Sequence, residues 1–265
     1  MIKKKISIIG CGNIGLSLLQ GILRNETIPA KNIIATRRNI QELSYLKEYG
    51  IRLTTENIRA VKESGLVIIA VKPYNIINVL EEIKDHLDPL KHILISVTTG
   101  ITISQIQDVV KKPVPIFRVM PNISASVGKS VSCICYNRAG TKVIESVKYL
   151  FDMIGTTMII DEELMQSATI LGSCGIAYVL RFIRAMVQGG IQIGFDAKTA
   201  SAIVNQTVKG AADLLIERHE HPEFEIDKVT TPKGCTIVGL NEMEHNGFSS
   251  SLIKGIVASY EKIEI

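Results

Sequence analysis

The chain has 265 residues, and 46% of them are hydrophobic, so it has room for one full domain and a smaller second one. Its 30 basic and 26 acidic residues leave a net charge of only +4. The basic side chains are scattered except at residues 3–5, 37–38 and 111–112, which indicates a solvated surface and argues against a nucleic-acid-binding stripe.

Neither a signal peptide nor a membrane span is expected. The lysines at 3–5 precede an apolar stretch that breaks at Gly10 without a small-residue cleavage site, so we expect a cytosolic protein. The longest apolar region, residues 168–187, contains Arg181 and Arg184 before it reaches the roughly 20 apolar residues that a bilayer requires. We therefore expect a buried helix or a helix in a subunit contact.

The five cysteines are widely spread and odd in number, which is typical of reduced intracellular thiols. Cys133 and Cys135 would share one face of a strand, but no second pair completes a zinc site. We expect them to pack in the core or at an edge, and we expect no metal.

Short β-branched runs recur along the first 160 residues and predict strands. They are ISIIG (6–10), NIIAT (32–36), IRLT (51–54), LVIIAV (66–71), HILISV (92–97), PIFRV (115–119), VSCICY (131–136) and TMII (157–160). Between most of them apolar residues recur at helical spacing, as at 16, 19, 22 and 23. Strands that alternate with helices predict an α/β fold with a doubly wound, mostly parallel, Rossmann-like sheet.

After residue 160 the strand-like runs stop and helical periodicity takes over at 164–188, 197–217 and from 249 to the end. We expect Asp161 and Asp196 to be N-caps and the glycines at 189, 190 and 194 to interrupt the helices. The predicted domains are 1–160, which binds a dinucleotide, and 161–265, which is helical. A helical region this rich in apolar residues can bury only part of its apolar surface within one chain, which favours an intertwined dimer.

Gly10, Gly12 and Gly15 have G-x-G-x-x-G spacing directly after the first predicted strand. In a dinucleotide-binding turn the first glycine makes the tight turn, the second lets the backbone approach the pyrophosphate, and the third lets helix and strand pack closely. The helix that follows adds free N–H groups and the positive end of its dipole. A purely structural glycine turn is the alternative.

The end of the second predicted strand bears on which nucleotide binds. NAD enzymes usually have an acidic residue there for the ribose hydroxyls, whereas this chain has Thr36, Arg37 and Arg38. A hydroxyl and two guanidinium groups suit a 2′-phosphate, so NADP is predicted, with NAD as the alternative. The other interpretation is that the arginines only solubilise a loop.

Turn-forming segments follow three later strands. Val71, Lys72 and Pro73 end the fourth strand, and residues 96–102 and 117–124 follow the next two. Ligands of open α/β sheets lie at the carboxyl ends of the strands, so these segments are expected to border the nicotinamide half of the cofactor. Ordinary strand-end turns remain the alternative.

A polar loop near the carboxyl end, VTTPKGCT (229–236), leads into a predicted helix over 235–244. The first amides of that helix have no intrahelical partner. With the hydroxyls of Thr230, Thr231 and Thr236 they would form an anion cradle suited to a carboxylate. A helix capped by a hydroxyl group is the equal alternative.

These segments together resemble the pyrroline-5-carboxylate reductase family along nearly the whole chain. The matching motifs are GCGNIG (10–15), VKP (71–73), ISVTTGIT (95–102), RVMPN (118–122), GSCGIAYV (172–179), NQTVKGAA (205–212) and VTTPKGCT (229–236). The chain departs from the family pattern at Lys233, at Cys235 and within 172–176, which bears on loop shape and substrate selectivity. Pro232, Gly234 and Thr236 match the signature loop.

The resemblance implies a Rossmann domain, a helical dimerisation and substrate-binding domain, and an active site at the dimer interface, with assembly into a decamer as a further possibility. The implied reaction is NAD(P)H-dependent reduction of 1-pyrroline-5-carboxylate to L-proline. The predicted catalytic residues are Thr231, Gly234, Cys235 and Thr236. The predicted cofactor-binding residues are Gly10, Gly12, Asn13, Ile14, Gly15, Thr36, Arg37, Arg38, Asn57, Val71, Lys72, Pro73 and Asn122.

The proposed site contains no obvious general acid, so positioning should dominate catalysis. The amides of Gly234, Cys235 and Thr236 would hold the carboxylate while the Thr236 hydroxyl bonds the ring nitrogen or relays its proton. Cys235 is interpreted as a small filler rather than a reactive thiol, and the histidines at 219, 221 and 245 as surface residues.

Two alternatives stay open. Another imine reductase or a β-hydroxyacid dehydrogenase would share the amino-terminal half and would carry a catalytic lysine in the helical half with an asparagine nearby. Lys198 and Lys209 are present there, but neither lies in a context that recommends it. A non-catalytic NADP-binding regulator would keep the fold and lose turnover.

Overall fold

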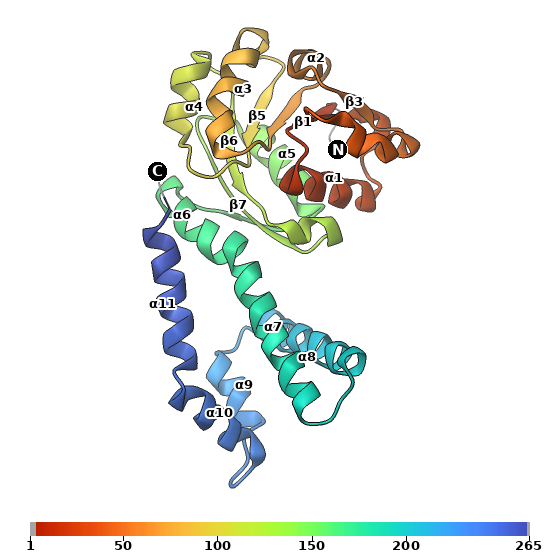
Figure 1. Ribbon diagram of the computed structural model, residues 1–265. Coiled ribbons are helices and arrows are strands. Elements are labelled where there is room, and N and C mark those ends of the chain that lie inside the picture. The colour runs from red at the N-terminus through yellow and green to blue at the C-terminus, as the bar shows by residue number, and fades with distance from the viewer. Residues whose placement is uncertain (1–3, 264–265) are drawn as a thin grey trace. The chain divides into compact units, whose positions relative to one another are not determined.

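The computed structural model describes residues 4–263 and forms two compact units (Figure 1). The first unit runs to Ser173 and takes in Lys262, and the second is Cys174–Glu261. The boundary expected near residue 160 falls just after the last strand. The first unit extends further because Met165, which is 1% exposed, packs into one of its hydrophobic clusters.

The first unit is built on one eight-stranded sheet with strand order β3-β2-β1-β4-β5-β6-β7-β8. All neighbouring strands are parallel except β6 and β7, which are antiparallel. Every run predicted as a strand forms one, and the α/β class is confirmed. The strands are β1 Ile6–Ile9, β2 Ile33–Thr36, β3 Arg52–Thr54, β4 Leu66–Ile69, β5 Ile93–Ser96, β6 Ile116–Met120, β7 Ser130–Tyr136 and β8 Gly155–Ile159.

Helices cover both faces of the sheet, which is why the central strands are apolar at nearly every position. Successive side chains of β1 enter different clusters: Ile8 packs on one face and Ile9 on the other. The Ile8 face is covered by α1 (Asn13–Asn25), α5 (Thr141–Asp152) and the 3-10 helix Ile40–Tyr49. The Ile9 face is covered by α2 (Asn57–Glu63), α3 (Ile76–Ile83) and α4 (Ile103–Val110).

Short helical turns connect these elements. They are the 3-10 helices Ala30–Asn32, Pro73–Asn75, Lys84–His86, Ile123–Val127 and Glu162–Leu164, followed by α6 (Met165–Ala168) and a π-helix at Thr169–Cys174. Cys133 and Cys135 both lie in the Ile9-side cluster, so they share one face of β7 as predicted. All five cysteines are free thiols.

The second unit contains only helices: α7 (Gly175–Gln192), α8 (Ala197–Arg218), α9 (Pro222–Lys228), α10 (Cys235–His245) and α11 (Phe248–Glu261). The helices predicted at 164–188, 197–217 and from 249 are confirmed, although residues 264–265 lie outside the described part. The Asp196 side chain caps α8 by accepting from the amides of Lys198 and Thr199.

Of the predictions about helix ends, one is confirmed and another is wrong in part. Asp161 is the N-cap residue of the 3-10 turn Glu162–Leu164, although its side chain makes no capping hydrogen bond. Gly189 and Gly190 lie inside α7, because neither needs a positive φ and the chain continues through them as helix. The helix instead ends before Gly194, whose φ of +115° is readily adopted only by glycine.

The second unit buries little apolar surface by itself. Its hydrophobic cluster has three buried members, Val187, Ala200 and Val204. Many large apolar side chains stay exposed, among them Ile193 at 80%, Ile216 at 67% and Val238 at 66%. Exposed apolar area on this scale is typical of a surface that another chain covers.

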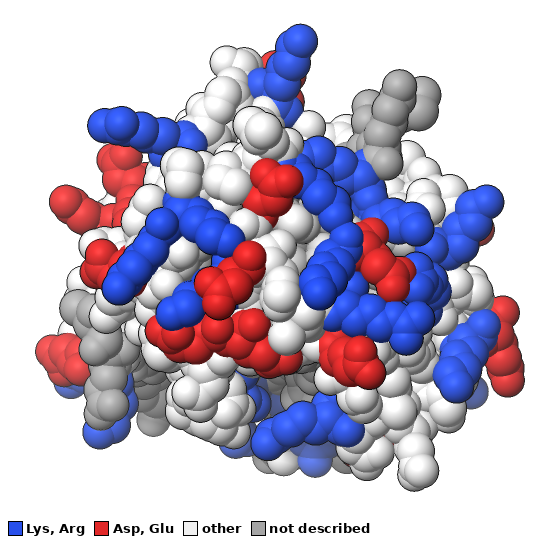
Figure 2. Space-filling model, turned by 90° about the horizontal axis from the view of Figure 1, so that it is seen from above, with Lys and Arg blue, Asp and Glu red and all other residues white. Residues whose placement is uncertain are grey.

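One helical stretch in the described part, Glu162–Gln192, is long and apolar enough to cross a membrane, with a mean hydropathy of 1.6. A single stretch of this kind is weak evidence for a membrane span, because core helices of soluble proteins and signal sequences have the same length and composition. Charges of both signs are interspersed on the face of the molecule that Figure 2 shows.

Candidate functional site

A cleft of about 920 Å³ opens at the carboxyl ends of the strands in the first unit. It lies where the strand order reverses between β1 and β4, the usual ligand site of an open α/β sheet. The segments after β5 and β6 also contribute to it, through Val97, Thr98, Met120 and Pro121. Of the predicted cofactor-binding residues, the cleft is lined by Gly10, Gly12, Asn13, Ile14, Thr36, Arg37, Arg38, Asn57, Val71, Lys72 and Pro73.

The three glycines of the first turn have different surroundings. Gly10 has a φ of +86°, and a Cβ there would lie 2.4 Å from Val71 Cγ1. At Gly15 a Cβ would lie 2.9 Å from the Gly10 carbonyl oxygen, which explains why Gly15 sits behind the turn and does not line the cleft. A Cβ on Gly12 would meet nothing within 4 Å.

Gly12 therefore presents bare backbone to open space beside the first turn of α1. The amides of Asn13, Ile14 and Gly15 are the first three of that helix and have no intrahelical acceptor. This arrangement fits the pyrophosphate of a dinucleotide.

A chain of hydrogen bonds, part-buried at Thr36 and exposed at Glu82, lies along the cleft. The Thr36 hydroxyl accepts from the Gly10 amide at 3.3 Å and donates to Asn57 Oδ1 at 2.7 Å. Asn57 Nδ2 donates in turn to Glu82 Oε2 at 2.8 Å. Both ends of the Asn57 side chain are thus held by partners from β2 and α3, and Glu82, which no local motif indicated, joins the cleft wall.

The two arginines after β2 are held differently. Arg37 Nη1 donates to the Cys11 carbonyl at 3.3 Å, and Arg37 Nη2 pairs with Glu42 Oε2. Asn39 Nδ2 donates to the other carboxylate oxygen of Glu42 at 2.9 Å. Arg38 is exposed and forms no salt bridge with any residue in 4–263. Glu42 lines the cleft, and sequence reasoning missed it because it lies on the following 3-10 helix.

The thiol inside the glycine turn is not reactive. Cys11 is fully buried, and this burial raises its pKa to about 11 although the positive charge of Arg37 acts in the opposite direction. A thiol with this pKa stays protonated at neutral pH. Cys11 therefore fills space behind the cleft.

The structure does not place Asn122 in the cleft, which corrects its predicted role. Asn122 is 4% exposed, and its Nδ2 donates to the Gly172 carbonyl at 2.8 Å. Its Oδ1 accepts from the Ser124 amide at 3.0 Å. The side chain thus anchors the π-helix to the end of β6, and its neighbours Pro121 and Ile123 form the cleft wall instead.

The carboxyl-terminal loop lies in the second unit and leads into α10 as predicted. Lys233 has a φ of +60°, and Gly234 is the N-cap of the helix. The predicted catalytic side chains Thr231, Cys235 and Thr236 are all exposed.

Two details of this loop differ from expectation. The Gly234 amide donates to the Thr231 carbonyl at 2.9 Å, so the amides without intrahelical acceptors belong to Cys235, Thr236 and Ile237. The Thr230 hydroxyl donates to the Ile226 carbonyl at 2.8 Å and therefore closes the preceding helix rather than joining an anion cradle. Gly234 is needed for space, because a Cβ there would lie 2.5 Å from Thr231 Oγ1.

The histidines lie at helix ends, as expected. His219 follows α8, His221 caps α9 by accepting from the Glu223 amide, and His245 ends α10. Within residues 4–263 no group of three or more His, Cys, Asp or Glu side chains is arranged to hold a metal.

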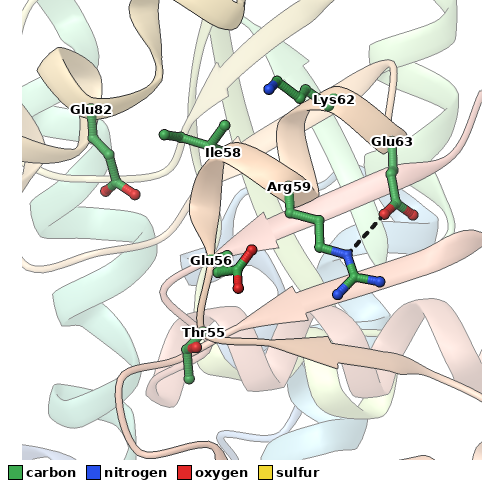
Figure 3. A pocket seen from close by; sticks show the side chains of 7 residues that line it. All are labelled: Thr55, Glu56, Ile58, Arg59, Lys62, Glu63 and Glu82. Atoms are coloured by element: carbon green, nitrogen blue, oxygen red, sulfur yellow. Dashed lines mark hydrogen bonds and ion pairs between the residues drawn. The ribbon is translucent and has the colours of Figure 1, made fainter.

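A second, more open groove of about 650 Å³ runs along α2 (Figure 3). Arg59 points toward Glu63 and bonds it at 3.1 Å, and Arg52 pairs with the same carboxylate. These bonds hold the pKa of Glu63 below its usual value. Because its central charges neutralise one another, this groove has no evident preference for a charged ligand.

The comparisons with known proteins agree with this geometry. The family model for pyrroline-5-carboxylate reductase dimerisation matches residues 162–264, and the model for NADP oxidoreductase, coenzyme F420-dependent, matches residues 5–100. Among solved structures, the pyrroline carboxylate reductase of Plasmodium falciparum with NADP bound aligns with a TM-score of 0.89 and 26% identity, covering 100% of this chain and 98% of that one. The pyrroline-5-carboxylate reductase of Coxiella burnetii aligns with a TM-score of 0.87 and 27% identity, covering 98% of this chain and 97% of that one.

Two curated relatives come from Dictyostelium discoideum. Pyrroline-5-carboxylate reductase 1 is 41% identical over 97% of this chain, which spans only 49% of that relative's length. Pyrroline-5-carboxylate reductase 2 is 42% identical over 98% of this chain and 92% of its own length. Together with the glycine turn, the arginine-bearing cleft and the loop before α10, these matches establish that the chain belongs to the pyrroline-5-carboxylate reductase family.

Proposed function

We propose that this chain catalyses the NAD(P)H-dependent reduction of 1-pyrroline-5-carboxylate to L-proline, the last step of proline biosynthesis. The strongest support is 42% identity to a named reductase over 98% of this chain and 92% of the relative. The cleft supports the same conclusion, because its glycine turn and arginines suit NADP(H).

The first unit would hold the cofactor through groups that the structure brings together. Backbone at Gly12 and the first amides of α1 receive the pyrophosphate, and Arg37 and Arg38 face the 2′-phosphate. Lys72 and Pro73 border the nicotinamide half. Bound NADPH supplies the hydride that reduces the imine carbon.

The second unit would hold the substrate at the start of α10. The amides of Cys235, Thr236 and Ile237 bind the substrate carboxylate, and the Thr236 hydroxyl bonds the ring nitrogen and orients the imine. The Thr236 side chain is exposed, so its hydroxyl is accessible to a ligand. Positioning rather than acid–base chemistry by a histidine or a carboxylate pair then accounts for most of the rate.

The enzyme would work as a homodimer that can assemble further, up to a decamer, in the cytosol and without nucleic-acid or membrane partners. The exposed apolar surface of the second unit and the dimerisation family model over 162–264 support the dimer. In this arrangement the exposed loop of one protomer completes the cofactor cleft of its partner.

An oxidation assay with NADPH tests the reaction. Purified protein is expected to oxidise NADPH with 1-pyrroline-5-carboxylate and to form proline, but not to act on a panel of β-hydroxyacids with NADP⁺. The opposite preference would identify a hydroxyacid dehydrogenase, and cofactor binding without any turnover would identify a regulator. Lys209 is a poor candidate for a catalytic lysine, because it is exposed and paired with Asp213, which raises its pKa.

A further inference from the structure

Glu42 places a carboxylate at the position where the cofactor cleft presents its arginines. One of its oxygens pairs with Arg37 Nη2 and the other accepts from Asn39 Nδ2. Arg37, Arg38, Asn39 and Glu42 all line the same cleft. The Glu42 side chain is half exposed, so it is free to leave Arg37 at little cost in stability.

Arg37 would keep its place without Glu42. Its Nη1 donates to the Cys11 carbonyl beside the glycine turn, so the guanidinium stays at the cleft rim when Nη2 changes partner. A 2′-phosphate that approaches Arg37 must therefore displace Glu42 or lie beside it. In both cases the carboxylate repels the phosphate and competes for the same guanidinium.

We propose that Glu42 sets the coenzyme selectivity of this enzyme. It lowers the affinity of the cleft for a cofactor with a 2′-phosphate, because its negative charge neutralises Arg37. Toward a cofactor without that phosphate it accepts from the ribose hydroxyl, the task that an acidic residue at the end of the second strand performs in NAD enzymes. The chain thereby accepts both cofactors. This inference rests on the proposed cofactor site but not on the identity of the substrate.

Binding of two adenosine fragments to the full-length protein tests the inference without turnover. The probes are adenosine 2′,5′-bisphosphate and 5′-AMP, titrated by calorimetry at one fixed salt concentration. The variant is Glu42→Gln, and the matched control is Glu48→Gln, which removes the same charge from the same 3-10 helix at an exposed residue outside the cleft.

In Glu42→Gln the affinity for the bisphosphate is expected to rise about fivefold and that for 5′-AMP to fall, so the selectivity ratio increases about tenfold. Glu48→Gln should leave the ratio unchanged. An unchanged or lower ratio in Glu42→Gln overturns the inference, because Glu42 would then merely orient Arg37. An equal change of the selectivity ratio in Glu48→Gln also overturns the inference, since the net charge of the protein rather than the position of Glu42 would then be the cause.

Reduction of 1-pyrroline-5-carboxylate is measured in parallel on the same preparations. If the fragment ratio shifts as expected but the wild-type protein does not reduce this substrate, the proposed function fails while the role of Glu42 stands. If reduction is normal and the ratio does not move, the inference about Glu42 fails alone.

Discussion

At the scale of single residues, the glycines of the first turn have different roles: Gly12 affects cofactor binding and Gly10 affects stability. Gly12 has an extended backbone with φ −85°, and a Cβ on it would meet nothing within 4 Å. The free energy of unfolding of Gly12→Ala should therefore lie within about 0.5 kcal/mol of the wild-type value. It should bind NADPH about tenfold more weakly, because the added methyl occupies the space that the pyrophosphate needs. Urea unfolding and fluorescence titration with NADPH measure the two quantities.

Gly10→Ala is the contrasting variant. Its Cβ would lie 2.4 Å from Val71 Cγ1 on a backbone with φ +86°, so it should lose about 1–3 kcal/mol of stability. If Gly12→Ala were the less stable of the two, the space beside Gly12 would not be open.

Thr236 offers a second test at this scale. The residue is exposed, so Thr236→Ala should leave the thermal midpoint nearly unchanged while turnover falls about tenfold to a hundredfold through loss of the hydroxyl at the ring nitrogen. Thr141→Ala is a matched control, because Thr141 is also exposed in the first turn of a helix with a glycine N-cap. Full turnover in Thr236→Ala would remove this hydroxyl from the mechanism.

His92 makes stability depend on pH. The side chain is 2% exposed; Nδ1 accepts from the Asp88 amide at 2.8 Å and Nε2 donates to the Val61 carbonyl at 3.1 Å. Burial lowers its pKa below the unfolded value of 6.5. The unfolded chain then takes up the proton first, so the stability from His92 is complete above pH 6.5 and is lost as pH falls through the folded pKa.

The measurement is the free energy of unfolding in urea at pH 7.5 and at pH 5.5. Wild type should lose more stability between these values than His92→Gln, which cannot titrate. Equal losses would mean that other groups account for the whole acid effect.

At the scale of elements, a part-buried ion pair connects β6 to the segment that leads toward the helical unit. Arg118 on β6 donates from Nη1 to Glu162 Oε1 at 2.6 Å, and the same oxygen accepts from the Ile103 amide at 2.8 Å. The Arg118 side chain is 8% exposed and that of Glu162 is 34% exposed. Arg118 Nε is buried without a partner in the described residues, so the guanidinium depends on Glu162.

Removing the carboxylate should therefore cost more than removing the guanidinium. Glu162→Ala leaves a buried charge unpaired and should lose about 2–4 kcal/mol, whereas Arg118→Met leaves a partly hydrated carboxylate and should lose about 1–2 kcal/mol. The double variant should lose less than the sum of the two. Chemical denaturation of the three proteins measures these values, and the reverse order of the single variants would contradict this account.

At the scale of the whole molecule, the proposed sharing of sites between protomers predicts complementation. At NADPH concentrations near the wild-type Kd, the cofactor cleft of Gly12→Ala stays largely empty, and Thr236→Ala impairs the substrate loop. If each site combines a cleft with the partner's loop, a hybrid dimer has one intact site. A mixture that is denatured and refolded together should then regain up to about one quarter of wild-type activity.

The same variants mixed without refolding provide the control, because stable dimers exchange subunits slowly. No gain of activity after joint refolding would mean that each site is built within one chain. Light scattering of the wild type should at the same time give a mass of at least two 29.1 kDa chains.

Much of this architecture could be predicted from local patterns. Short β-branched runs are enough to predict the strands, and the glycine spacing is enough to predict the turn. Both signals lie in residues that are close together in the chain. The helix after Gly234 and the cap at Asp196 follow from the same kind of signal. Local patterns were less informative about helix interiors, where Gly189 and Gly190 continue α7 with ordinary helical backbone.

By itself, the sequence determined the order of elements, the glycine turn, the two arginines and the signature loop, because each depends on residues close together in the chain. Only the tertiary structure decided which distant side chains meet. It brought Glu82 to Asn57 in the cleft, and it turned Asn122 away to hold the π-helix. These partners come from different elements, and a side chain's partner is set by packing rather than by its neighbours in the chain.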